Sequence, residues 1–272
     1  MAETVEFYIR DLPEQITKEV NTHIRLFAVT MLITDDEDSP VIPCAGTLSN
    51  IKGHKGIITA RHVWEEMKQH KNLLIMLGEK PHLVEVEVLN AIVPPIQSRS
   101  EKISTDIPDL AFILLPQHSI NLLEVTTKVF YSVDKRLNEE NMEFFKNKQG
   151  YFVLFGAPVE LIDYQKNLVP SFMYSTSRSE YFEHDGWDYQ IMGKNLEENP
   201  EIPNNLKGVS GGGIWKIKIM FDDDKTPLDV ENPNNDIALV GVNFNQTDLK
   251  GRQIIGHGPA SIYKVLYDYI VQ

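Results

Sequence analysis

Apolar and polar positions follow a strand-like pattern along most of the chain. Residues 24–34, IRLFAVTMLIT, form a run rich in apolar and β-branched residues, and the acidic turn DDEDSP separates it from VIPCAGTLS and GIITA. Short apolar runs that end at turn residues are typical of strands. Further runs of this kind are NLLIML, HLVEVEVLN and LAFILLP. The first half of the chain is therefore predicted to be a meander of strands.

The second half repeats this pattern after a polar stretch. Residues 132–150, SVDKRLNEENMEFFKNKQG, have the composition of a linker with room for a helical turn. Beyond them, short strands are predicted at YFVLFGAPVE, FMYSTSRSEYF, WDYQIMG, GGIWKIKIM and IALVGVNFN. Turns rich in Pro, Asn, Asp and Gly separate these strands, which favours a second β-barrel or β-sandwich.

Two helices are predicted outside the strands. In DLPEQITKEVN (11–21), Ile16 and Val20 are four residues apart, and PASIYKVLYDYIVQ (259–272) carries apolar residues at i, i+3, i+4, i+7 and i+8. Both spacings put the apolar side chains on one helical face. The fold class is all-β, and the predicted organisation has four parts: a helical extension (1–23), a β-rich half (24–130), a linker (131–150) and a second β-rich half with a C-terminal helix (151–272).

Charge and cysteine content narrow the class of protein. The net charge of −13 argues against a general affinity for nucleic acid or an anionic membrane, because phosphate binding needs clustered Lys and Arg. Cys44 is the only cysteine, so no internal disulfide can form, which fits a reducing compartment. Neither a signal sequence nor a spanning apolar run is present. A soluble cytoplasmic protein without metal or cofactor is expected.

The segment LKGVSGGGIW (206–215) carries the first candidate chemistry, because it places Ser210 between glycines. Ser210 is either a nucleophile in a backbone cradle or a small residue in a glycine turn. Gly208, Ser210 and Gly212 match G-x-S-x-G, the pattern of the α/β-hydrolase nucleophile elbow. That elbow needs a strand before the serine and a helix after it. Here a loop precedes Ser210 and a strand is predicted to follow, so that fold is excluded.

A serine nucleophile needs a base, and the base needs a group that orients it. Among the histidines, His62 has the fitting context, because GIITARHVWEE is a predicted strand that runs into a helical turn. Asp109 stands directly before the apolar strand in DIPDLAFILLP, whereas Asp106 lies farther out in the loop. Seen singly, His62 would be interpreted as a core histidine and Asp109 as a turn or cap residue. The order His, Asp, Ser along the chain distinguishes chymotrypsin-type enzymes from other users of this chemistry.

Three motifs in that order resemble the chymotrypsin and trypsin-like serine protease family. GIITARHV is similar to the family's T-A-x-H segment, PDLAFILL to its Asp-before-strand segment, and GVSGGG to its G-x-S-G-G loop. The resemblance spans about residues 24–272 and is that of an intracellular, disulfide-free, prokaryotic-like branch. It implies two antiparallel six-stranded β-barrels, with His62 and Asp109 in the first and Ser210 in the second. It also implies peptide-bond hydrolysis through an acyl-enzyme, with a protein or peptide as substrate.

The resemblance assigns further residues to binding roles. The N–H groups of Gly208 and Ser210 would form the oxyanion hole. Asn204, Asn243 and His257 fall at the substrate pocket, which predicts a polar or acidic residue before the cut bond, with His257 as partner for a carboxylate.

Two further expectations concern regulation and activity. Val209 replaces the aspartate that pairs with a newly cut N-terminus in the digestive members, so activation by cleavage is not expected. A regulatory protein partner is a further candidate. The alternative function is a catalytically silent homologue that acts as a protein-binding module.

Overall fold

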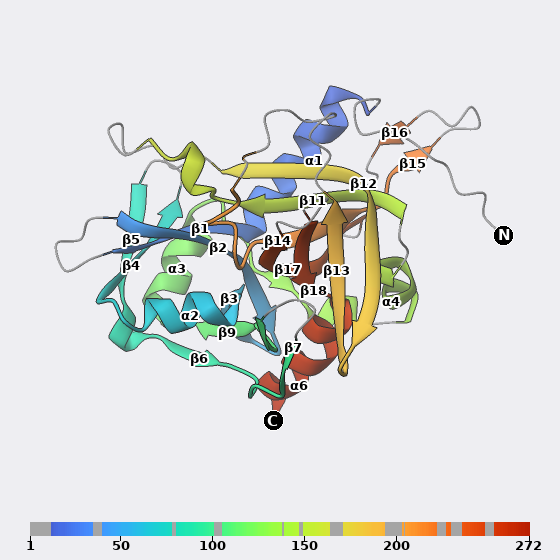
Figure 1. The fold of residues 1–272 in the computed structure, drawn as a ribbon. Coiled ribbons are helices and arrows are strands. Elements are labelled where there is room, and N and C mark those ends of the chain that lie inside the picture. The colour runs from blue at the N-terminus through green and yellow to red at the C-terminus, as the bar shows by residue number, and fades with distance from the viewer. Residues whose placement is uncertain are drawn as a thin grey trace.

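The computed structural model describes twelve stretches of the chain, and they form two β-rich halves with few helices (Figure 1). The described residues are 12–34, 40–77, 80–100, 105–137, 139–146, 149–163, 171–193, 203, 205–221, 227–229, 236–247 and 253–272. The predicted all-β class with two halves is confirmed.

The first half is an eight-stranded sheet in the order β5-β4-β1-β2-β3-β9-β6, with β10 paired to β2. It has more strands than the six predicted, because the short segments 90–92 and 131–132 also pair. All residues of β1 are buried, so both faces of the sheet's middle are covered. The strands are β1 Ala28–Thr34, β2 Pro40–Ile51, β3 His54–Thr59, β4 Asn72–Leu77, β5 Lys80–Glu85, β6 Asn90–Ile92, β9 Ala111–Leu114 and β10 Tyr131–Ser132.

The second half is a closed antiparallel barrel of six strands, in the order β11-β12-β13-β18-β17-β14. This closure leaves no free edge among those strands, and the strand number agrees with the prediction. The strands are β11 Gln149–Gly156, β12 Phe172–His184, β13 Trp187–Gly193, β14 Gly213–Ile217, β17 Ile237–Thr247 and β18 Gln253–His257. Two hairpins stand apart from the sheets: β7 Ser98–Ser100 with β8 Thr105–Ile107, and β15 Met220–Phe221 with β16 Pro227–Asp229.

The N-terminal helix α1 spans Glu14–Phe27 and is longer than predicted. Its buried residues Ile16, Val20, Ile24 and Phe27 recur at helical spacing, so the apolar face continues through the residues assigned to the start of the first strand. The helix therefore ends four residues after the predicted boundary at 23.

Other helices are short, and all of those before the last strand connect strands. They are α2 Arg61–Met67, α3 Gln117–Val125, α4 Glu139–Lys146 and α6 Tyr267–Val271, with 3₁₀ turns at Val86–Val88, Asp134–Arg136 and Val159–Leu161 and a π-helical segment at Ser261–Leu266. The predicted linker thus contains β10, a 3₁₀ turn and α4. The predicted C-terminal helix is present, as a π-helical segment that continues into α6.

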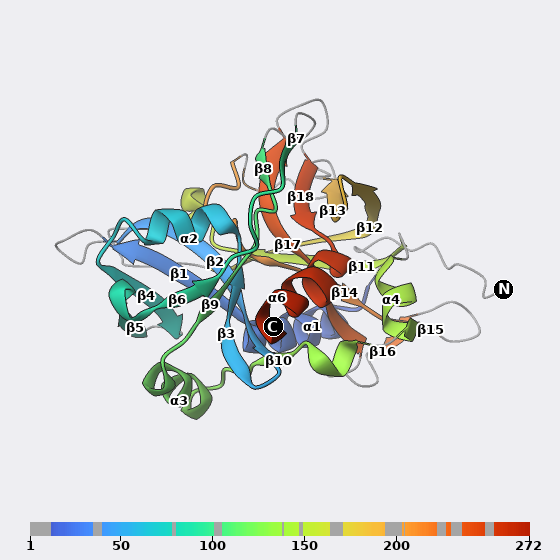
Figure 2. The same ribbon diagram turned by 90° about the horizontal axis from the view of Figure 1, so that it is seen from below.

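The two halves share one core. Phe27 stacks on Trp215 of β14 with ring centroids 5.6 Å apart, and Tyr131 meets the same indole edge-on at 5.4 Å. The hydroxyl groups of Tyr131 and Tyr263 are hydrogen-bonded at 2.7 Å. These rings join α1 and β10 of the first half to the barrel and the C-terminal helix, which fixes how the halves meet. Figure 2 shows the ribbons of α1, β10, β14 and α6 in this region.

Candidate active site

Strands β3 and β9 bring the predicted base and acid together. They are antiparallel neighbours with Thr59 opposite Ala111, so the end of β3 and the start of β9 lie at the same edge. The backbone N–H of His62 donates to Oδ1 of Asp109 at 2.9 Å, and Nδ1 of His62 lies 2.7 Å from Oδ2. Because a carboxylate only accepts, Nδ1 carries the proton. Asp106 is exposed on β8, away from this contact.

The two side chains differ in exposure. The Asp109 side chain is 6% exposed, whereas that of His62 is 49% exposed. Burial opposes protonation of His62, but the hydrogen bond and charge of Asp109, with the charge of Glu66, outweigh it and raise the pKa of His62. In the described ranges Nε2 of His62 has no hydrogen-bond partner. The ring therefore presents an unprotonated nitrogen at an accessible position.

The serine loop of the second half packs directly on the first half. The backbone carbonyl oxygen of Ser210 accepts a hydrogen bond from the Ala45 N–H at 3.0 Å. Gly211 has φ +83°, and a Cβ there would collide with Thr59 Oγ1 and the Ala45 carbonyl oxygen. Only glycine fits both the conformation and the space. Since Thr59 ends β3, this contact places the loop next to the strand that leads into His62.

In the part of the chain that the structure describes, no direct hydrogen bond joins the predicted nucleophile and the predicted base. Among the contacts of the described residues, Ser210 Oγ has no hydrogen bond with His62. In free enzymes such bonds are often long or poorly aligned and tighten only around a substrate. The structure therefore brings His62 and Asp109 into contact and leaves Ser210 in the adjoining loop.

The N–H groups of the serine loop fall into two sets. Those of Val209, Gly211 and Gly212 donate to main-chain carbonyl oxygens at 3.0, 2.7 and 2.9 Å. Those of Gly208 and Ser210 have no partner in any part of the chain that the structure describes. Gly208 has φ +96°, a conformation that leaves its N–H out of the loop's own hydrogen bonds. Backbone N–H groups without an acceptor are rare where the chain is buried, so the pair offers a site for an external oxygen.

The predicted substrate-pocket residues lie in different surroundings. Asn204 is outside the described residues. Asn243 is buried, and its backbone donates to Gly212 and accepts from Gly211 at 2.9 and 2.7 Å. His257 is fully buried, and its Nε2 accepts the Asp109 N–H at 2.9 Å. The structure thus places His257 behind Asp109 and not at an open pocket where a substrate carboxylate could reach it.

Sequence reasoning missed the contact between His257 and Asp109. Alternation along the strand could not have found it, because residues 254–257 of β18 are all buried and neither face of the strand is marked as the outward one. The contact of Ser210 with Ala45 has no signal in the side-chain pattern either, since it joins the serine loop to strand β2 through backbone atoms.

We expect the free energy of unfolding to fall as the pH is lowered from about 6.5 toward 4. Burial lowers the pKa of His257 from 6.5 to about 4, although the charge of Asp109 opposes this. Between these pH values His257 binds a proton in the unfolded chain but not in the folded chain. Its contribution to the free energy of unfolding is therefore complete above the pKa of the unfolded state, and it is lost as the pH falls to the pKa of the folded state. The loss amounts to about 3 kcal/mol at ~1.4 kcal/mol per pKa unit.

Urea unfolding at stepped pH tests this expectation. His257→Gln has no group that titrates there, so its stability should depend less steeply on pH between 4 and 6.5 than that of the parent protein. Equal slopes in the two proteins would contradict the assignment.

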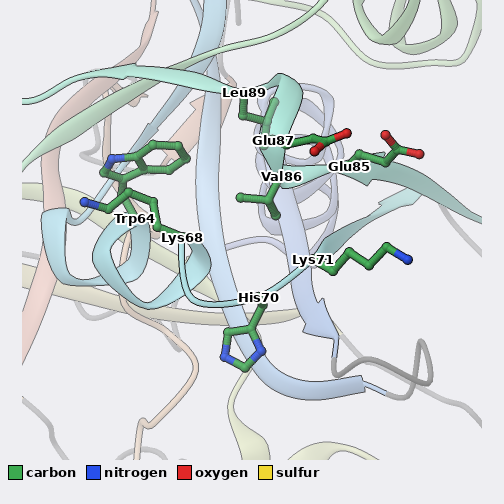
Figure 3. Close-up of a pocket in the computed structure, with 8 residues that line it drawn as sticks. All are labelled: Trp64, Lys68, His70, Lys71, Glu85, Val86, Glu87 and Leu89. Carbon is green, nitrogen blue, oxygen red and sulfur yellow. The ribbon is translucent and has the colours of Figure 1, made fainter.

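A separate hollow lies beside α2 (Figure 3). It has a volume of about 580 Å³ and is lined by Trp64, Lys68, His70, Lys71, Glu85, Val86, Glu87 and Leu89. No residue of the predicted triad lines it. In the parts that the structure describes, no helix is long and apolar enough to cross a membrane.

The comparisons with known proteins found similar proteins among solved structures only. No protein-family model matches the chain, and a search of curated proteins found no match. An inactive form of Rv3671c from M. tuberculosis H37Rv, with a serine-to-alanine change, is 12% identical; the match covers 99% of this chain and 97% of that one, with a TM-score of 0.50. The thermostable serine protease AL20 from an extremophilic microorganism is 12% identical and covers 90% of this chain and 96% of that one, with a TM-score of 0.49.

These neighbours are serine proteases of trypsin-like fold, and the chain has that fold. The resemblance inferred from the three sequence motifs is thereby confirmed for the fold. At 12% identity the likeness does not extend to individual residues, so the roles of the triad rest on the geometry of this chain.

Proposed function

We propose that the protein is a serine endopeptidase that cleaves protein or peptide substrates in the cytoplasm. The observation that carries this proposal is the pairing of His62 with Asp109, at 2.7 Å between Nδ1 and Oδ2. This bond holds the ring in the tautomer that a general base requires, with the lone pair on Nε2. The raised pKa of His62 favours proton uptake once a nucleophile is deprotonated.

The proposed reaction uses the three predicted residues in turn. Ser210 Oγ attacks the substrate carbonyl carbon while Nε2 of His62 takes its proton, and the amine leaves when His62 returns that proton to it. Water then attacks the resulting ester, again with His62 as base, and releases the acid product and free Ser210. Asp109 keeps its negative charge throughout and stabilises the protonated ring.

The unpaired N–H groups of Gly208 and Ser210 support a role for the loop in this reaction. An oxyanion that forms on the substrate carbonyl would accept from both. Each such donor typically contributes about 3 to 4 kcal/mol to stabilisation of the transition state. Because the neighbouring N–H groups are already bonded to carbonyl oxygens of the loop and of β17, the cradle is fixed before substrate arrives.

A catalytically silent homologue that binds other proteins is the alternative. The observation in its favour is that Ser210 Oγ has no hydrogen bond with His62 in the described structure. The N–H pair and the His62–Asp109 contact weigh against it, since binding alone requires neither.

Labelling with a fluorophosphonate separates these two functions. We expect stoichiometric modification of the full chain, mapped to Ser210 by peptide mass spectrometry, and prevented by prior heat unfolding. Ser171 is an exposed serine outside the site, and it should stay unmodified. Absence of label on Ser210 at millimolar reagent, with the fold intact by circular dichroism, would favour the silent homologue.

A further inference from the structure

Among the described residues of the barrel, His257 is the titratable side chain that contacts the proposed acid, Asp109. It ends β18, where it lies between Val242 of β17 and Tyr189 of β13. Its ring stacks on Phe244 with centroids 4.6 Å apart and 28° between the planes, and Tyr189 and Trp187 lie at 5.4 and 5.6 Å. Three aromatic rings therefore fix the imidazole in position.

The hydrogen bond from Asp109 defines the state of this ring. A backbone N–H can only donate, so Nε2 of His257 must present its lone pair and the ring is neutral with its proton on Nδ1. In the described ranges Nδ1 has no partner, so the contact with Asp109 is the polar bond that this ring makes. Burial lowers the pKa of His257 to about 4, which keeps the acceptor available at neutral pH.

Asp109 is thus held from two sides. Its carboxylate accepts from the backbone and ring of His62 in the first half, at 2.9 and 2.7 Å, and its N–H donates to His257 in the second half at 2.9 Å. The segment that leads to Asp109 also touches the barrel, since Trp187 Nε1 donates to Gln97 Oε1 at 3.1 Å. Figure 2 shows the β7–β8 hairpin of this segment reaching toward β18.

We propose that His257 is a positioning residue that holds the main chain of Asp109. The Asp109 carboxylate then faces His62 only when the two halves are packed against each other. The proposal rests on the proposed serine protease function for its catalytic consequence. Without an acceptor at His257 the buried N–H of Asp109 loses its partner, and the loop is released toward other arrangements. The orientation of His62 then loosens as well.

Three variants of one position test this role. His257→Phe keeps an aromatic ring but removes the acceptor, and we expect fluorophosphonate labelling of Ser210 and kcat each to fall about 10- to 100-fold, with KM little changed. His257→Gln places an amide oxygen near the position of Nε2 and should restore most of the rate, whereas the shorter His257→Asn should not. Tyr189→Phe keeps the ring that packs beside His257 and removes only a hydroxyl that has no hydrogen-bond partner in the described structure, so it should behave like the parent protein.

Two NMR measurements on the full chain report the role without activity. In the parent protein a scalar coupling across the N–H···N bond should join the Asp109 amide nitrogen to Nε2 of His257. The pKa of His62, followed by titration of its ring protons, should fall in His257→Phe and His257→Asn and recover in His257→Gln. If the role of His257 were structural alone, the substitutions would lower the free energy of unfolding and leave the His62 titration unchanged.

The outcomes separate the two proposals. A parent protein that is not labelled on Ser210 but shows the coupling and the shifted titration would overturn the proposed function and support the positioning role. Normal labelling in all variants with an unchanged His62 titration would overturn the positioning role alone. If the variants fail to fold, absence of the coupling in the parent protein would overturn it.

Discussion

Replacing Ser210 by alanine is expected to abolish hydrolysis, with a loss of kcat on the order of 10⁶. The substitution removes the attacking oxygen, and neither His62 nor the N–H groups of the loop can supply another nucleophile at that position. Stability should change by less than about 1 kcal/mol, since the hydroxyl makes no hydrogen bond in the described structure. Initial rates on a peptide-library substrate and on an activated ester, with thermal unfolding alongside, provide the measurement.

Ser171→Ala is the matched control, because Ser171 is exposed and lies at the start of β12. It should retain full activity. Hydrolysis by Ser210→Ala above the rate of the heat-inactivated protein would refute the assignment of the nucleophile, and a contaminating protease would be recognised by equal activity in both variants.

Asp109→Asn is expected to lower kcat by about 10⁴. An amide can donate to Nδ1 of His62, which favours the tautomer with the proton on Nε2, the wrong one for a base. Removing the carboxylate should also lower the pKa of His62, because the hydrogen bond and charge of Asp109 are what raise it. The acidic limb of the activity profile should therefore move to lower pH in what activity remains.

Asp106→Asn removes the same charge three residues away, at an exposed position of β8 where the side chain does not touch His62. Its activity and its His62 titration should match the parent protein. A large loss in Asp106→Asn with little effect of Asp109→Asn would show that the acid was wrongly chosen.

Local patterns predicted the fold because each depends on neighbouring residues. Alternating apolar runs gave the strands of both halves, and the spacing of Ile262, Leu266 and Ile270, all buried, gave the C-terminal helix. The start of the first strand was misplaced for the same reason. Ile24 and Phe27 suit a strand by composition, but they extend the buried face that Ile16 and Val20 begin, and packing against the core decides in favour of the helix.

The candidate site was only partly predictable, because its contacts join segments far apart in the chain. The motif order indicated His62, Asp109 and Ser210. The side chain placed at the substrate pocket, His257, instead lies under Asp109, 148 residues away in sequence. Pocket residues were assigned by position along strands, and a single residue of shift in register moves a side chain from one face to the other.

The support of the serine loop by Asn243 has a consequence for synthesis of the chain. Gly211 and Gly212 bond to the backbone of Asn243 in β17, and β18 closes the barrel between β13 and β17. A ribosome therefore finishes all three residues of the proposed triad before it makes the strands that hold the nucleophile in place. A nascent chain that already contains Ser210 still lacks these supports, so the serine loop can take its final arrangement only after β17 and β18 have been made.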